Sequence, residues 1–131
     1  MPPQQLIWLI LILLGSLPGC GTDNTVIVKG SVLCDGQLLA AGEILLIDET
    51  GLERPTWAVV HQGNFETRCT PGHKRVEIRA TRPKIANKND PDAKGMREDY
   101  IPARYNRDSV LKENISNNKV NELRIEISMM Q

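Results

Sequence analysis

Aromatic side chains and histidines are scarce in this chain, and neither charge sign is in excess. Phe, Trp and Tyr make up 4% of 131 residues, there are two histidines, and 16 basic residues balance 16 acidic ones. Phosphate recognition needs clustered Lys and Arg, so the absence of a basic stripe argues against a nucleic-acid partner. A zinc site needs three or four ligands in close register, and neither His61 nor His73 belongs to such a cluster.

Patterns typical of catalytic and calcium-binding sites are missing as well. No serine sits in a G-x-S-x-G elbow, the arrangement that activates a nucleophile in many hydrolases. Counting Asp90 as the first ligand of a calcium loop puts Asp92 third and Gly95 sixth. Lys94 then falls fifth and Ile101 twelfth, where calcium requires a bidentate Glu. We therefore expect no enzyme activity, no catalytic residues, no metal and no other cofactor.

The chain also lacks an apolar run long enough to span a bilayer. Residues 6–14 read LIWLILILL, and extension to residue 17 gives about 18 Å of helix, against a bilayer core of about 30 Å. This length is typical of the apolar region of a secretory signal peptide. Residues 1–19 contain no Lys, Arg, Asp or Glu. We expect residues 1–19 to be a leader and the protein to be exported.

The end of this leader, Leu17-Pro18-Gly19-Cys20, resembles the lipobox of bacterial lipoproteins. The resemblance implies that Cys20 becomes the lipidated first residue, and that it anchors the protein to a membrane through its acyl chains. Pro18 stands where Ala, Ser or Thr is usual, and the first five residues carry no Lys or Arg. A plain signal peptide cut near Gly19 and an uncleaved anchor are the alternatives.

From residue 25 onward the pattern is period-two alternation, which indicates half-buried strands. A short tether at residues 20–25 precedes a domain over residues 26–128. Turn signals separate the strands, and a hairpin turn is expected at 116–119, whereas the polar stretch 82–99 reads as a long loop. Short strands at this spacing predict an all-β fold, an antiparallel β-sandwich of about seven strands. The expected strands are 25–34, 42–48, 56–62, 65–69, 74–81, 110–115 and 121–127.

Four segments in succession, VKGSVLCDGQLLAAGEILLI, GNFETRCTPGHKRVEIRA, YIPARYN and NELRIEI, resemble one family in order and spacing. The chain is similar to small exported lipoproteins of planctomycete-type bacteria that carry a carboxypeptidase regulatory-like domain. The resemblance covers essentially the whole chain after the leader. It implies a prealbumin-like sandwich and a non-catalytic module.

The remaining two cysteines, Cys34 and Cys69, are a candidate disulfide. Strand parity puts Cys34 on the same face as Val32 and Cys69 on the same face as Phe65, so both are expected to point into the core. Disulfides persist in exported proteins, and a lipidated Cys20 would leave these two as an even pair. The alternative is two buried free thiols that pack as small apolar groups.

Four further side chains, in two pairs, are candidates for contacts or crosslinks. Tyr100 and Tyr105 are expected to hold the long loop against the sandwich, and they are the candidate contact surface for a partner. Lys29 on the first strand and Asn121 on the last invite comparison with the Lys–Asn crosslinks of some surface proteins. Lys29 falls on the polar face of its strand, so a solvated lysine is expected instead.

Together these features predict an exported lipoprotein, anchored in the cell envelope through Cys20. Its sandwich is expected to serve a structural or interaction role, with an envelope protein or polysaccharide as the unidentified partner. The alternative is a peptide- or glycan-binding module that uses the 82–106 loop.

Overall fold

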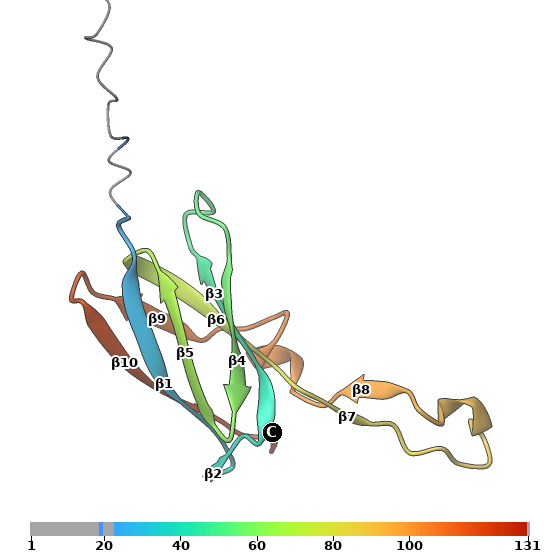
Figure 1. Ribbon diagram of the computed structural model, residues 1–131. Helices are drawn as coiled ribbons and strands as arrows, with labels where there is room; N and C mark the ends of the chain where they lie inside the picture. The colour runs from blue at the N-terminus through green and yellow to red at the C-terminus, as the bar shows by residue number, and fades with distance from the viewer. Residues whose placement is uncertain (1–18, 20–22, 131) are drawn as a thin grey trace, which may run out of the picture.

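The computed structural model describes residue 19 and residues 23–130, so Cys20 lies outside the described residues (Figure 1). Within them the chain forms β-strands and two short 3-10 helices, η1 (Pro91–Ala93) and η2 (Ala103–Tyr105). The strands are β1 (Val26–Cys34), β2 (Gln37–Leu38), β3 (Ala41–Asp48), β4 (Thr56–His61), β5 (Asn64–Cys69), β6 (Gly72–Arg79), β7 (Thr81–Pro83), β8 (Arg97–Asp99), β9 (Lys112–Ile115) and β10 (Val120–Ile127). No helix among these residues is long and apolar enough to cross a membrane.

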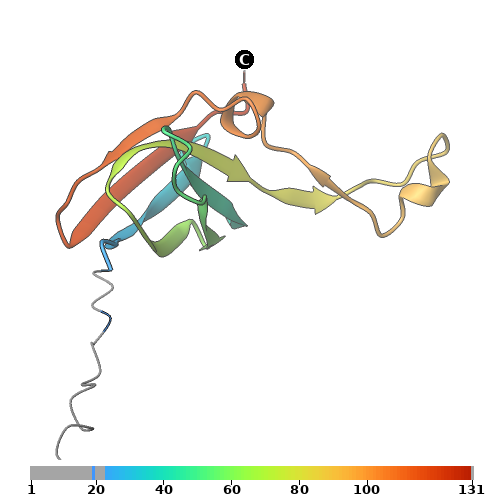
Figure 2. The same cartoon turned by 90° about the horizontal axis from the view of Figure 1, so that it is seen from above.

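The strands of the body form one curled sheet in the order β10-β1-β5-β4-β3-β6-β9, with β2 added to β1. Curling brings the two halves of the sheet face to face, as the view from above shows (Figure 2). β4 and β5 share the single pair His61–Asn64, so the sheet folds over at this hairpin. The predicted all-β fold is confirmed, in a form consistent with a β-sandwich.

The residues that side-chain alternation predicts to face inward are the ones buried in the core. Val28 and Val32 of β1, Ile44 of β3, and Val76 and Ile78 of β6 are each 0% exposed. These residues share the inward parity of their strands, because successive side chains of a strand point to opposite faces. The buried cluster continues through β4, β5, β9 and β10, so all layers contribute to one core.

The predicted hairpin between the last two strands is wrong. β9 pairs with β6, whereas β10 pairs with β1 in parallel orientation. The two strands therefore lie at opposite ends of the strand order, and residues 116–119 cross between the halves of the curled sheet. Asn121 stabilises this crossing, because its amide oxygen accepts from the Ser116 backbone N–H at 2.9 Å and its amide nitrogen donates to the Ser116 carbonyl at 3.0 Å.

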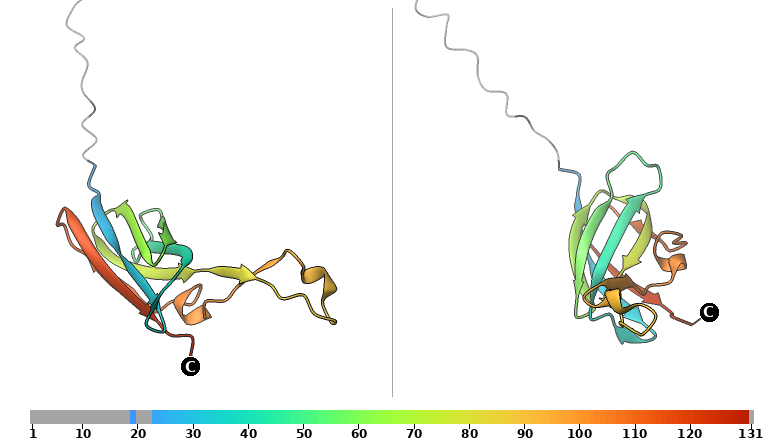
Figure 3. Two further views of the ribbon diagram at one scale, coloured as in Figure 1. Left: turned by 60° about the horizontal axis from the view of Figure 1, so that its bottom comes forward. Right: turned by 90° about the vertical axis from the view of Figure 1, so that its right-hand side faces the viewer.

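The polar stretch 82–99 is not a loop lying over the body but a projecting arm (Figure 3). β7 and β8 pair antiparallel in register Thr81–Asp99, Arg82–Glu98 and Pro83–Arg97. Water reaches both faces of this ribbon, so its sequence needs no apolar alternation and shows none. An Arg82–Glu98 ion pair at 2.7 Å and a Lys84–Asp90 ion pair at 2.7 Å connect its two sides.

The sandwich has two ends, which we call the tether pole and the arm pole. At the tether pole β1 begins at Val26, which pairs with Cys69 at the end of β5. At the arm pole β1 ends at Cys34, and Arg79 at the end of β6 leads into the arm. A nine-residue strand spans about 30 Å, and that length separates the two poles along β1.

Gly30 marks the closest approach of two strands. It pairs with Leu123 of β10 on one side and with Phe65 of β5 on the other. A Cβ atom at Gly30 would collide with the backbone carbonyl of Leu123, which belongs to the ladder and has no freedom to turn away. Phe65 lies beside this gap in the side-chain layer and is only 5% exposed.

We expect Gly30→Ala to lower the free energy of unfolding by about 2 kcal/mol or more, because the new methyl group must push β1 and β10 apart. Urea unfolding followed by circular dichroism measures the loss. Ser31→Ala, on the next residue of β1, is the matched control and should change stability by less than about 0.5 kcal/mol. Equal stability of Gly30→Ala and the wild type would contradict the close approach.

Candidate functional site

The predicted Cys34–Cys69 disulfide is wrong, because the two cysteines lie at opposite poles and both are free. Cys69 pairs with Val26 at the start of β1, while Cys34 is the last residue of that strand. Eight steps along a strand cover about 26 Å, whereas a disulfide requires Cα atoms within about 7 Å. Strand parity was right about the shared inward face, but it carries no information on position along the strand.

Neither thiol is activated as a nucleophile or as a metal ligand. Burial, with the nearby Asp35 carboxylate, raises the pKa of Cys34 above its usual value. Burial raises the pKa of Cys69 as well, and the Lys74 charge offsets only part of that shift. A thiol with a raised pKa stays protonated at neutral pH, and the protonated form is a poor nucleophile and metal ligand.

Tyr100 and Tyr105 both lie at the base of the arm, half-buried against the core. The Arg82 guanidinium lies 5.6 Å from the ring centroid of Tyr100, and the Arg104 guanidinium lies 4.8 Å from that of Tyr105. The Tyr105 hydroxyl accepts a hydrogen bond from the Ser128 backbone N–H at 3.3 Å. The rings thus attach the arm base to the body as expected, while their role as a contact surface stays a prediction.

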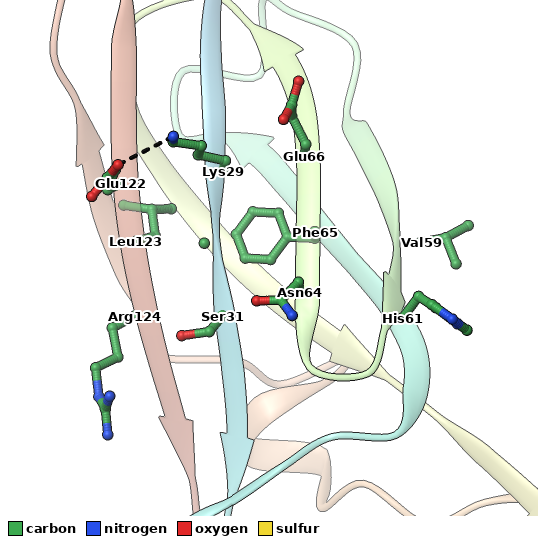
Figure 4. A pocket seen from close by; sticks show the side chains of 11 residues that line it. Lys29, Ser31, Val59, His61, Asn64, Phe65, Glu66, Glu122, Leu123 and Arg124 are labelled. Carbon is green, nitrogen blue, oxygen red and sulfur yellow. Dashed lines mark ion pairs between the residues drawn. The ribbon is translucent and has the colours of Figure 1, made fainter.

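An open groove of about 750 Å³ lies on the outer side of β10, β1, β5 and β4 (Figure 4). Lys29 and Glu122 point toward each other across β1 and β10 and form an ion pair at 3.3 Å. The Lys29 side chain is 46% exposed, which confirms the solvated lysine expected from its parity. The lining residues are Lys29, Gly30, Ser31, Val59, His61, Asn64, Phe65, Glu66, Glu122, Leu123 and Arg124.

The chemistry of this groove favours weak contacts over catalysis. Lys29 and Glu122 neutralise each other, and both remain in water, so this pair contributes little binding energy. Within residues 19 and 23–130, no three His, Cys, Asp or Glu side chains gather as a metal site would require. Every buried side-chain nitrogen or oxygen of this part of the chain also has a hydrogen-bond partner. The groove therefore offers an extended polar surface.

An exposed apolar strip on β4 was missed from the sequence. Trp57 and Val59 are 62% and 58% exposed, while Ala58 and Val60 between them face the core. The signal was present in the TWAVVH alternation, because inward Ala58 and Val60 force Trp57 and Val59 outward. The prediction of strand 56–62 did not ask which of its apolar residues faced water.

Two buried charge clusters were also missed. Glu77 is 4% exposed although it lies on the outward parity of β6, because Arg75 and Arg79 cover it and donate to its two carboxylate oxygens at 2.7 and 2.9 Å. Lys74 is 2% exposed and faces inward at the tether pole. Its ammonium group donates to Asp48 at 3.2 Å and to the Thr70 hydroxyl at 3.1 Å.

Comparison with known proteins adds evidence on the fold. No protein-family model and no curated protein sequence matches the chain. The fold is similar to part of the crystal structure of BcpA, the major pilin subunit of Bacillus cereus, with a TM-score of 0.51 and 15% identity over 82% of this chain and 31% of that chain. A variant of BcpA gives a TM-score of 0.50 with 17% identity, over 79% of this chain and 30% of that chain.

A DUF3823 family protein from Parabacteroides merdae has a TM-score of 0.42 and 18% identity, over 78% of this chain and 45% of that chain. The present chain thus spans about a third of the pilin subunit's length. At these identities the likeness to BcpA concerns the fold, and it supports an all-β domain.

The buried Lys74–Asp48 pair gives a stability prediction. Lys74→Met leaves the Asp48 carboxylate without its cation, so we expect the free energy of unfolding to fall by about 3 kcal/mol. Lys29→Met, which breaks an exposed ion pair, is the control and should cost less than about 1 kcal/mol. Urea titration of both variants at pH 7 makes the comparison. Similar small losses in both would contradict a role for burial.

The same pair predicts the direction of the acid dependence. The Thr50 hydroxyl, followed by Lys74, holds the pKa of Asp48 below its usual value. Its contribution is therefore complete above the unfolded pKa of about 4 and is lost as the pH falls through the lower folded pKa. Asp48→Asn should flatten this part of the stability profile.

Proposed function

We propose that the protein is an exported lipoprotein, anchored in a membrane of the cell envelope through Cys20. Its β-sandwich is a non-catalytic module of the carboxypeptidase regulatory-like, prealbumin-like type. The module serves a structural or interaction role, with an envelope protein or polysaccharide as its partner. The leader at residues 1–19 and the Leu17–Cys20 segment support the anchoring.

One observation carries the proposal: the chain enters the domain at one pole, and the arm leaves from the other. β1 starts directly after the tether, and its far end at Cys34 lies at the arm pole (Figure 1). A lipid on Cys20 would therefore hold the tether pole near the bilayer and place the base of the arm at the far end of the sandwich, from which the arm projects sideways (Figure 1). This arrangement suits a protein that presents a projecting element to a partner in the envelope.

Several side chains that could do chemistry are held protonated or are engaged in structural contacts. Both core thiols have raised pKa values, and the Ser109 hydroxyl donates to the Val76 carbonyl in the interior. Lys74 is held by Asp48 and Thr70. These contacts favour a non-catalytic module. A protein with a similar fold is named as a pilin subunit, which agrees with a structural role.

A second candidate function is recognition of a peptide or glycan through residues 82–106. The arm tip exposes two large apolar side chains, Ile85 at 83% and Met96 at 53%. Hydrogen bonds order the tip, because the Asn87 side-chain oxygen accepts hydrogen bonds from the backbone N–H groups of Asn89 at 2.9 Å and Asp90 at 3.0 Å. An ordered tip loses little conformational entropy on binding, which favours a recognition role.

Cys20→Ala tests the anchor. We expect the wild type to carry acyl mass and to partition into detergent, because several acyl chains give stable membrane attachment. The variant should lack that mass and stay in the aqueous phase. Phase separation with a nonionic detergent and intact-mass measurement provide both readouts. Cys34→Ala is the matched control and should behave as the wild type, whereas unchanged partitioning of Cys20→Ala would refute lipidation.

Replacing residues 85–95 by Asn-Gly tests the arm. Lys84 and Met96 are already joined by a backbone hydrogen bond at 2.9 Å, so a two-residue turn can close the shortened ribbon. We expect the melting temperature to stay unchanged, since the removed side chains do not belong to the core cluster. Cosedimentation with isolated cell-wall sacculi should fall if the arm recognises glycan or peptide. Equal cosedimentation of both proteins favours the purely structural role.

A further inference from the structure

A large apolar side chain stands in water at the tether pole. Leu52 is 87% exposed, the highest value among the large hydrophobic side chains of the described residues. It lies in the loop 49–55 that joins β3 to β4. No core contact accounts for it, although the neighbouring positions of this loop are polar, glycine or proline.

The loop holds Leu52 in a defined position. Asp48 at its root is fixed by Lys74, and the Thr50 hydroxyl donates to the Asp48 carboxylate. The Leu52 backbone N–H donates to the same Thr50 hydroxyl at 3.3 Å. Gly51 has φ +71° and donates to the Asp48 carbonyl at 3.1 Å, a conformation that favours glycine. The Lys74–Asp48 ion pair is thus linked through Thr50 to an ordered turn, and this turn exposes Leu52.

This turn lies at the same pole as the start of the domain. Figures 1 and 3 both show the loop between β3 and β4 rising beside the first residues of β1. The Glu49 backbone N–H also donates to the His73 carbonyl at 3.2 Å, which joins the loop to the start of β6 at this pole. Ile85 and Met96, the exposed apolar residues of the arm tip, belong to the arm, whose base lies at the opposite pole.

The length of chain between the anchor and the domain limits the distance from the membrane. Only six steps separate Cys20 from Val26 in the sequence, and a fully extended chain of that length covers about 20 Å. The arm pole lies about 30 Å further along β1. A lipidated Cys20 would therefore bring the tether pole, and not the arm pole, to the bilayer surface.

The composition of the pole suits the boundary between headgroups and acyl chains. Val120 at the start of β10 is 44% exposed and lies next to Lys119, and Leu52 is followed two residues later by Arg54. Apolar side chains can enter the lipid while basic stems reach the headgroups. Glu53 in the same loop offsets one positive charge. Contact should therefore depend on apolar insertion more than on anionic lipid.

We infer that the loop 49–55, with Leu52 at its apex, is a membrane-contact surface that seats the domain on the lipid bilayer. This inference rests on the proposed lipidation of Cys20 and adds the orientation of the domain. The anchor supplies attachment, while Leu52 and Val120 fix the tether pole against the surface. The base of the arm then lies at the end of the sandwich that is away from the membrane (Figure 1).

Tryptophan fluorescence of the full, lipidated protein tests the surface. A Trp57→Phe background leaves no tryptophan after the leader, which contains Trp8, is removed. Leu52→Trp then reports on the loop, and Ile85→Trp, at a similarly exposed position of the arm tip, is the matched control. Each protein is reconstituted into phosphatidylcholine vesicles with and without brominated acyl chains, which quench tryptophan on contact.

We expect brominated lipid to remove about half or more of the Leu52→Trp emission and to leave the Ile85→Trp emission unchanged. Adding phosphatidylglycerol should not increase the quenching. Vesicle-bound protein whose two variants are quenched equally, or not at all, would overturn the inference while leaving the anchor intact.

The same variants made with Cys20→Ala and expressed without residues 1–19, so that Trp8 is absent, separate the two proposals. Without the acyl chains we expect no flotation with vesicles and no quenching, since one leucine gives too little affinity. Flotation and quenching of Leu52→Trp in this background would support the contact surface and refute the need for lipidation. A wild type that carries no acyl mass and does not float would overturn both.

Discussion

The parallel ladder between β1 and β10 is the contact on which the rest of the structure depends. It joins the first strand of the domain to the last, from the pair Ile27–Val120 to the pair Cys34–Ile127. The other edge of β1 pairs with β5, so β1 has no free edge along most of its length. Closing a chain over so long a separation costs conformational entropy, which a continuous ladder and the buried face beneath it offset. Gly30 is the residue that allows the three strands to approach.

Much of the fold could be predicted because side-chain parity is a local property. Inward Val28, Ile44 and Val76 follow from alternation alone, and so does the outward Lys29. The choice of partner strand is not local. The stretch 116–119 has turn composition whether it reverses the chain or carries it across the sheet, so β9 and β10 were wrongly paired. The arm escaped prediction because a ribbon solvated on both faces has no apolar period.

The candidate site was less predictable, since it depends on distances along strands and on neighbours from other strands. Cys34 and Cys69 share a face but lie at opposite poles, and parity cannot distinguish these cases. The exposed position of Trp57 could have been found, because its inward neighbours determine its direction. The inward direction of Lys74 also follows from the parity of Val76. Its partners could not be predicted, since Asp48 from β3 and Thr70 from the turn before β6 must arrive at the same place.

The position of β1 also decides how the domain would respond to force. A pull on the residues before Val26 acts along the strand axis, parallel to β10 and antiparallel to β5. Such a load shears the two ladders that flank β1, so many backbone hydrogen bonds must yield together instead of opening one at a time. Resistance to pulling is governed by the unfolding rate and not by equilibrium stability. A domain held by this strand is therefore loaded in a direction that the β1–β10 and β1–β5 ladders resist together.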